Sequence, residues 1–102
     1  MENYNTNIKS LITYSKGGVI SKVVYKNDHD NVTLFCMSRG TDISEHTSTK
    51  SGTIYVIEGD GVFRLEGKDI KMMEGVVILM KKNAKHSLKT IKDTSFLLML
   101  HD

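Results

Sequence analysis

The chain has 102 residues, with 14 lysines and arginines against 12 aspartates and glutamates, so its formal net charge is +2. This length predicts a single domain, residues 1–102, that buries roughly two-thirds of its unfolded surface in one modest core. The basic excess is small, and no lysine and arginine cluster is interleaved with aromatic residues, which argues against nucleic acid as a partner.

Two features of the chain bear on its cellular location. Residues 1–5 lack the basic region and apolar run of a signal peptide, and no apolar stretch approaches membrane-spanning length. Cys36 is the one cysteine, so an internal disulfide is impossible, which fits a reducing cytosol. We therefore predict a cytoplasmic protein with no membrane partner. Within the apolar run 32–37, Cys36 is predicted to be a small core residue, and a pocket-lining thiol is the alternative.

The chain opens with a polar segment and continues as a series of short strands. We expect residues 1–7 to be loosely held, and residues 8–14 suit either a short helical turn or an edge strand. Nine β-type runs follow, broken by Gly, Asp and Asn turns. They cover residues 19–25, 32–38, 43–48, 53–58, 62–66, 69–73, 76–80, 86–91 and 95–101. Short strands at this spacing predict an all-β barrel or sandwich.

Three of these runs are apolar on both faces. A sheet with only one face in solvent would instead alternate apolar and polar residues along each strand. The three runs are residues 54–57, 76–80 and 96–100. A small barrel buries only the inner face of its strands, and a large bare apolar patch is rare on a monomer. A second copy of the chain would cover the outer face, so we predict a homodimer. An asymmetric sandwich that buries both faces is the alternative.

Two segments of the chain carry a histidine at a fixed distance from a glycine. The first opens at Gly40, contains His46 and closes at Gly59. The second opens at Gly75 and runs through an apolar stretch to His86. Each segment has the pattern of a strand, a turn and a further strand.

Together these segments resemble the two sequence motifs of the cupin family, in its small single-domain form. The resemblance extends over about residues 32–101, with motif 1 at about 40–59 and motif 2 at about 75–90. It implies an all-β fold, an antiparallel cupin barrel, which is also called a double-stranded β-helix or jelly roll. Residues 44–47, Ser-Glu-His-Thr, also resemble a common bacterial "SEHT" subgroup of small cupins that often lacks the second histidine of motif 1.

The resemblance further implies a set of metal ligands, of which this chain keeps two. His46 and His86 match the family's positions, whereas Ser48 stands where the family has its second histidine and Gly52 where it has its glutamate. Motif 2 also departs from the family at its proline, glycine and asparagine positions. These hold Lys81, Asn83 and Thr90 in this chain.

Strand alternation predicts which side chains share a wall of the barrel. Residues two apart in a strand point to the same face, so His46 and Ser48 are expected to share one face, and the resemblance implies that this face is the inner one. By the resemblance, His86 points into the same lumen from a distant strand on a facing wall. Two imidazoles in an otherwise apolar lumen are typical of a small-ligand site. We predict that His46, Ser48 and His86 bind a small organic molecule, and we assign no catalytic residue.

A bound divalent transition metal (Zn, Fe, Mn or Ni) is the alternative occupant, held by His46 and His86. It would make the chain a mononuclear metal-dependent enzyme of the dioxygenase or isomerase type. Catalytic metal sites usually take three or more protein ligands. The sequence does not fix whether His101 or Glu58 supplies a third. The two missing ligand positions favour ligand binding over the enzyme, and purely structural histidines are the third interpretation.

The remaining charged and histidine side chains are expected to lie in loops. Lys50, Lys81 and Lys82 adjoin the motifs near the expected barrel mouth, where they are either solvated or attract an anionic ligand. His29 lies in a loop rich in Asp and Asn and is expected to be solvated.

Overall fold

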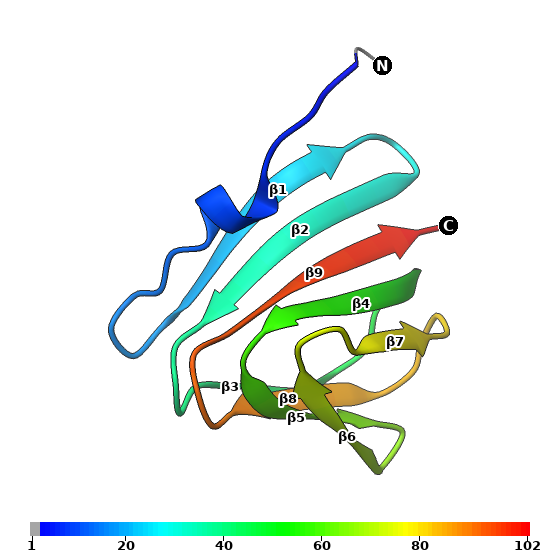
Figure 1. The fold of residues 1–102 in the computed structure, drawn as a ribbon. Helices are drawn as coiled ribbons and strands as arrows, with labels where there is room; N and C mark the ends of the chain where they lie inside the picture. The colour runs from blue at the N-terminus through cyan, green and yellow to red at the C-terminus, as the bar shows by residue number, and fades with distance from the viewer. Residues whose placement is uncertain (1–2) are drawn as a thin grey trace.

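The computed structural model describes residues 3–102 as two antiparallel sheets stacked face to face (Figure 1). A short 3-10 helix, Ile8–Leu11, precedes the strands. The strands are β1 (Val19–Lys26), β2 (Asp30–Met37), β3 (Asp42–His46), β4 (Ser51–Glu58), β5 (Asp60–Leu65), β6 (Lys68–Met73), β7 (Val77–Met80), β8 (His86–Thr90) and β9 (Thr94–His101). One sheet has the order β1-β2-β9-β4-β7 and the other β3-β8-β5-β6. We call them the five-stranded and the four-stranded sheet.

The all-β prediction is confirmed. Each run predicted as a strand contains one strand, and no boundary differs from the prediction by more than two residues. Residues 8–14 contain a helical turn and not an edge strand. Of the N-terminal residues predicted to be loose, Met1 and Glu2 lie outside the described part of the chain. Residues 3–7 have no regular secondary structure.

The main core lies between the two sheets. It is built from the inward-facing residues of strands that alternate buried and exposed positions, as β4 and β7 do. Phe35 and Phe96 of the five-stranded sheet stack there, with their ring centroids 5.2 Å apart. The buried core residues are Met37, Ile54, Val56, Phe63, Met72, Ile78, Met80, Ala84, Leu88 and Phe96.

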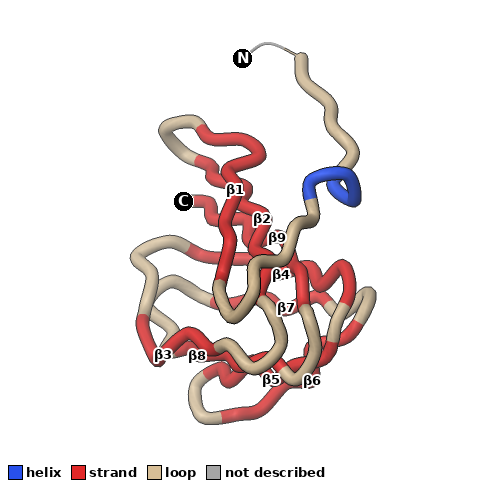
Figure 2. The backbone as a smooth tube through the Cα atoms, turned by 90° about the vertical axis from the view of Figure 1, so that its left-hand side faces the viewer, coloured by secondary structure: helices blue, strands red, loops and turns tan. Residues whose placement is uncertain are grey.

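A second apolar cluster covers part of the outer face of the five-stranded sheet. Leu34, Cys36 and Ile57 are buried there against the N-terminal segment, from which Ile8 and Leu11 pack onto them. Figure 2 shows this segment running beside the sheet. The core prediction for Cys36 is therefore right, since its side chain is fully buried. The sequence pattern did not predict that the chain's own N-terminal segment would cover part of this face.

The part of that outer face formed by β4 and β7 remains apolar and open. Tyr55, Val77 and Leu79 point outward from β4 and β7, and 40%, 56% and 72% of these residues are exposed. Tyr55 is paired with Val77 on one side and with Leu97 of β9 on the other. We call this surface the open face.

The glycines of the two motifs lie at turns that require them. The φ angles of Gly40, Gly59 and Gly75 are 77°, 124° and 88°. Residues other than glycine rarely adopt these backbone conformations. At Gly59 a Cβ would also lie 2.5 Å from the Cα of Thr94. Backbone sterics therefore explain why the motif has glycine at these positions.

No helix within residues 3–102 is both long enough and apolar enough to cross a membrane.

Candidate functional site

The two motif histidines lie side by side in the four-stranded sheet. His46 ends β3, His86 begins β8, and the two residues are direct partners across these strands. Their ring centroids are 4.1 Å apart and the ring planes meet at 59°. The expectation that the histidines come together is right, but the expectation of facing walls is wrong, because they occupy adjacent strands of one sheet.

An irregularity in β3 brings the two rings together. The pairing of β3 with β8 shifts between Ile43 and His46, as a β-bulge does when it turns a side chain to the other face. His86 is buried, and its ring stacks at 5.8 Å on Phe63 of the core. His46 is exposed. The pair therefore spans the boundary between the core and solvent.

Backbone carbonyl groups fix the protonation pattern of both rings. The Nδ1 atom of His46 lies 2.8 Å from the carbonyl oxygen of Ser44, and that of His86 lies 3.0 Å from the carbonyl oxygen of Ala84. A carbonyl oxygen only accepts hydrogen bonds, so each Nδ1 carries the proton. In the neutral rings each Nε2 then offers a lone pair. The pair presents two acceptors to a ligand.

Burial lowers the pKa of His86 below its ordinary value. The Ala84 carbonyl opposes this effect, whereas the neighbouring His46 adds to it, because two imidazolium charges would repel each other. His86 is therefore neutral at pH 7.

We expect the free energy of unfolding to fall as the pH drops below about 6.5. The unfolded chain protonates His86 near that pH, while the folded chain does so only at lower pH, so the unfolded state binds more protons. The slope due to this group is at most about 1.4 kcal/mol per pH unit. Urea unfolding at pH 7.5, 6.5 and 5.5 should show a weaker pH dependence in His86→Gln than in the wild type. Equal dependences would contradict the role of His86.

Ser48 lies outside the strand that was expected to contain it. β3 ends at His46, so the alternation that would put Ser48 on the same wall does not extend that far. The hydroxyl of Ser48 accepts a hydrogen bond from the Lys50 amide at 3.2 Å, and its carbonyl oxygen accepts one from the Asn83 amide at 2.7 Å. These bonds tie the β3–β4 turn to the β7–β8 loop. The ligand-binding role of Ser48 stays a prediction.

Core side chains surround Gly52, the residue at the family's glutamate position. Gly52 is buried in β4 between Met80 of β7 and Leu100 of β9. A Cβ at this position would lie 2.6 Å from the Met80 Cε and 3.2 Å from the Leu100 Cδ2. The space that a glutamate would need is therefore taken up by apolar packing.

Neither candidate for a third metal ligand joins the histidine pair. The Glu58 carboxylate accepts a hydrogen bond from the Tyr14 hydroxyl at 2.9 Å, beneath the N-terminal segment. His101 ends β9 opposite Asp30 and Ser51. Within residues 3–102, no three His, Cys, Asp or Glu side chains are grouped so that they could hold a metal ion. Two imidazoles do not amount to the donor set of a resident catalytic metal.

Thr90 braces the loop that leads into β3, a role that sequence analysis missed. Its buried hydroxyl oxygen lies 2.9 Å from the Ser38 carbonyl oxygen and 3.1 Å from that of Thr41, and it accepts a hydrogen bond from the Thr41 amide at 3.2 Å. This brace fixes the start of β3, which ends at His46. The only signal in the sequence was that Thr90 stands at the family's asparagine position.

The basic residues near the motifs fall into two groups. The Lys50 Nζ lies 3.3 Å from Asp102, whose carboxylate also contacts the exposed His29. Lys81 and Lys82 instead line a hollow of about 460 Å³ beside β7. A second hollow, of about 370 Å³, lies on the four-stranded sheet beside the Arg64–Asp69 ion pair. Neither hollow is lined by His46 or His86.

The family can be assigned from the sequence together with this fold. Residues 33–101 match the Cupin domain family. The chain belongs to the cupin family. The match covers nearly the same residues as the resemblance noted in the sequence, and the predicted antiparallel cupin fold is confirmed by the two stacked sheets.

Solved structures agree with the family assignment. This cupin is similar to a conserved protein of unknown function from Streptococcus pyogenes, with a TM-score of 0.88, 16% identity and coverage of 100% of this chain and 90% of the other. A cupin superfamily protein from Desulfitobacterium hafniense has a TM-score of 0.88 and 17% identity, with 99% and 93% covered. At this identity the likeness establishes the fold alone.

A third solved structure shows that this cupin fold also occurs within a longer chain. The cupin 2 conserved barrel domain protein from Leptotrichia buccalis has a TM-score of 0.89 and 19% identity. The alignment covers 95% of this cupin but 47% of that chain. No curated protein matched the sequence.

Proposed function

We propose that this cupin binds a small organic molecule through His46 and His86. The observation that carries the proposal is the pair of imidazole rings, with centroids 4.1 Å apart, whose Nδ1 atoms both hydrogen-bond to backbone carbonyls. Two neighbouring Nε2 acceptors suit a ligand that offers O–H or N–H donors. Ser48 remains a candidate third contact.

Screening by NMR tests this function directly. The imidazole proton and carbon signals of His46 and His86 would be followed while small hydroxylated compounds, amides and carboxylic acids are added. We expect binding compounds to shift the signals of both rings, and His86→Phe to remove the response. Compounds that bind without moving either ring would contradict the proposal.

A mononuclear metal-dependent enzyme is the second candidate function, and the two free Nε2 lone pairs favour it. Metal-ligating histidines usually donate their other ring N–H to a carbonyl or carboxylate, as both rings do here. The donor set is short of three ligands, so we propose that Zn, Fe, Mn or Ni binds weakly and needs both histidines.

We expect His46→Ala or His86→Ala alone to abolish the binding of divalent metal. Two ligands cannot fix a coordination sphere, and the loss of one leaves a single imidazole. The wild type should bind Ni²⁺ weakly at pH 7.5 and lose it as the pH falls, because only the neutral imidazole is a metal ligand. Isothermal titration measures both effects. His29→Ala is the matched control, because His29 is exposed and contacts Asp102. Wild-type affinity in either single variant would exclude the paired site.

We further propose a homodimer that buries the open face. The N-terminal segment covers one part of this sheet surface and leaves Tyr55, Val77 and Leu79 exposed on another. An identical copy offers the same apolar surface, and two-fold pairing of one patch with itself is the commonest form of oligomer.

Two further assignments rest on the sequence. We propose a cytoplasmic protein, because its single cysteine fits a reducing compartment. We also propose membership of the SEHT subgroup, on the sequence of residues 44–47 and the absence of the second motif histidine at position 48.

A further inference from the structure

The hollow beside β7 is separate from the proposed histidine site. Its volume is about 460 Å³, within the range of small-molecule pockets. It lies at the end of β7, where the β7–β8 loop approaches the β5–β6 turn. Besides Leu79, whose side chain also belongs to the open face, three apolar residues and three lysines line it. They are Leu65, Met80, Ala84, Lys68, Lys81 and Lys82.

The apolar part of the hollow belongs to the core of the molecule. Met80 and Ala84 are buried core residues, and Leu65 is half-buried against them. Leu65 comes from the four-stranded sheet and Met80 from the five-stranded sheet, so the hollow opens between the two layers. Methylene groups of a ligand placed there would be removed from water, which favours binding.

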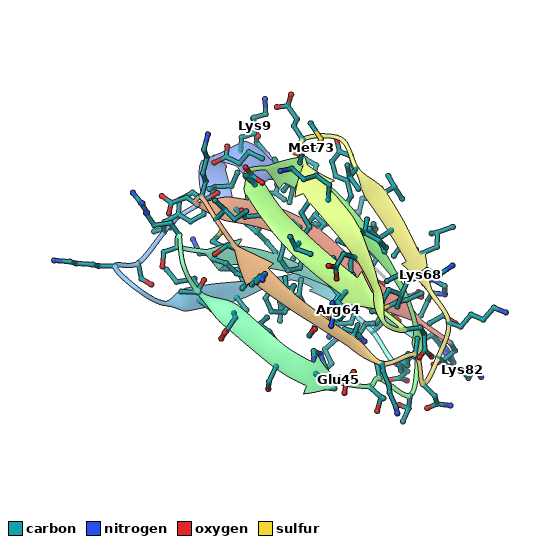
Figure 3. All side chains as sticks on the ribbon, turned by 90° about the horizontal axis from the view of Figure 1, so that it is seen from below. Lys9, Glu45, Arg64, Lys68, Met73 and Lys82 are labelled. Atoms are coloured by element: carbon teal, nitrogen blue, oxygen red, sulfur yellow. The ribbon has the colours of Figure 1, made fainter. Side chains whose placement is uncertain are left out.

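The polar part of the hollow is positively charged. Lys68, Lys81 and Lys82 are exposed, and none of them belongs to an ion pair found among residues 3–102. Glu66 is the acidic residue of the lining, so the lysines outnumber it. Figure 3 shows Lys68 and Lys82 projecting from the same side of the molecule. Such a cluster of one sign attracts an anion.

We propose that this hollow binds a small amphiphilic carboxylate. The hydrocarbon chain lies on Leu65, Met80 and Ala84, and the carboxylate lies among the three lysines. An extended acidic peptide fits less well, because pairing with a sheet edge needs a strand along which to run. β7 has four residues, and the lining includes only its last two. The hollow is separate from the proposed histidine site, since neither His46 nor His86 lines it.

Titration calorimetry with a chain-length series tests the proposal. Hexanoate, heptanoate and octanoate are the probes, and octan-1-ol is the uncharged comparison. We expect affinity to rise about fourfold with each added methylene group. Octan-1-ol should bind more weakly than octanoate. Added salt should weaken octanoate binding and leave that of the alcohol unchanged.

Lysine variants identify the place of binding. The double variant Lys81→Gln with Lys82→Gln should weaken octanoate roughly two- to thirtyfold and leave octan-1-ol unaffected. The matched control is Lys16→Gln with Lys26→Gln, which has the same net charge. Lys26 belongs to β1, at the opposite edge of the five-stranded sheet. All four lysines are exposed, so both proteins should fold like the wild type.

Three results would overturn the proposal. Equal affinity for octanoate and octan-1-ol would remove the role of the lysines. Equal weakening by the control pair would mean that net charge alone attracts the anion. The His46→Ala variant should bind octanoate as the wild type does. Loss of octanoate binding in this variant would assign the ligand to the histidine pair instead. That last result would leave the proposed function intact, so the two proposals fail separately.

Discussion

Replacing Ser48 by His and Gly52 by Glu is expected to raise the affinity for divalent transition metals by orders of magnitude. The double variant brings the donor set from two side chains to four, which is the number that closes a coordination sphere. Both rings already present a free Nε2 atom, so only the missing donors need to be supplied.

The packing around Gly52 determines how the experiment is built. A side chain at this position meets the methyl group of Met80, so Gly52→Glu alone should cost about 1–3 kcal/mol of stability. Met80 is flexible, and Met80→Ala in the same chain makes room for the carboxylate. Isothermal titration with Zn²⁺ and Ni²⁺ measures the affinity. Thermal unfolding with and without metal gives an independent reading, because a bound metal raises stability.

A matched variant tests the direction of the new carboxylate. Thr53→Glu with Ser48→His adds the same groups, but residue 53 follows Gly52 in β4 and points to the other face of the sheet. Its metal affinity should stay near that of the wild type. If the Ser48→His, Gly52→Glu chain folds and binds metal no more tightly than the wild type, residues 48 and 52 do not face the histidine pair.

The strands were predictable because they follow from short-range patterns. Runs such as 54–57 and 96–100 are continuously apolar, the first of them rich in β-branched residues, and the turns between strands hold glycines with positive φ angles. Both signals act within a few residues of chain. The motif glycines are informative for this reason, since Gly59 has no room for a side chain next to Thr94.

The arrangement of the site depended on register, which the sequence does not display. His46 and His86 are neighbours because β3 pairs with β8 and because β3 is irregular between Ile43 and His46. One shifted residue changes the face to which a side chain points. The same limit explains Ser48, for which alternation was assumed two residues beyond the end of the strand.

The packing of the N-terminal segment on the outer sheet face was not predicted, for a different reason. Ile8 and Leu11 lie in residues 8–14, whose pattern suited either a helical turn or an edge strand. Their contacts with Leu34 and Cys36 join segments far apart in the chain. Strands that are apolar on both faces therefore have two explanations in this molecule. The N-terminal segment covers one part of the outer sheet face, and the other part is the open face.

Tyr55→Asp is expected to convert a wild-type homodimer into a monomer. Tyr55 is in the middle of the open face, paired with Val77 of β7 and Leu97 of β9. In a two-fold interface each copy brings the same residue, so one substitution buries two carboxylates without partners. An unpaired buried charge costs several kcal/mol, which raises the dimer dissociation constant by roughly 1,000-fold or more.

The single chain should tolerate this change, because Tyr55 is already 40% exposed without a partner. Ile91→Asp is the matched control, since Ile91 is 54% exposed in the β8–β9 turn, away from the open face. Sedimentation velocity at micromolar concentration should give a dimer for the wild type and Ile91→Asp, and a folded monomer for Tyr55→Asp. A wild type that sediments as a monodisperse monomer would mean that the open face stays in water. A Tyr55→Asp dimer as tight as the wild type would move the interface to another surface.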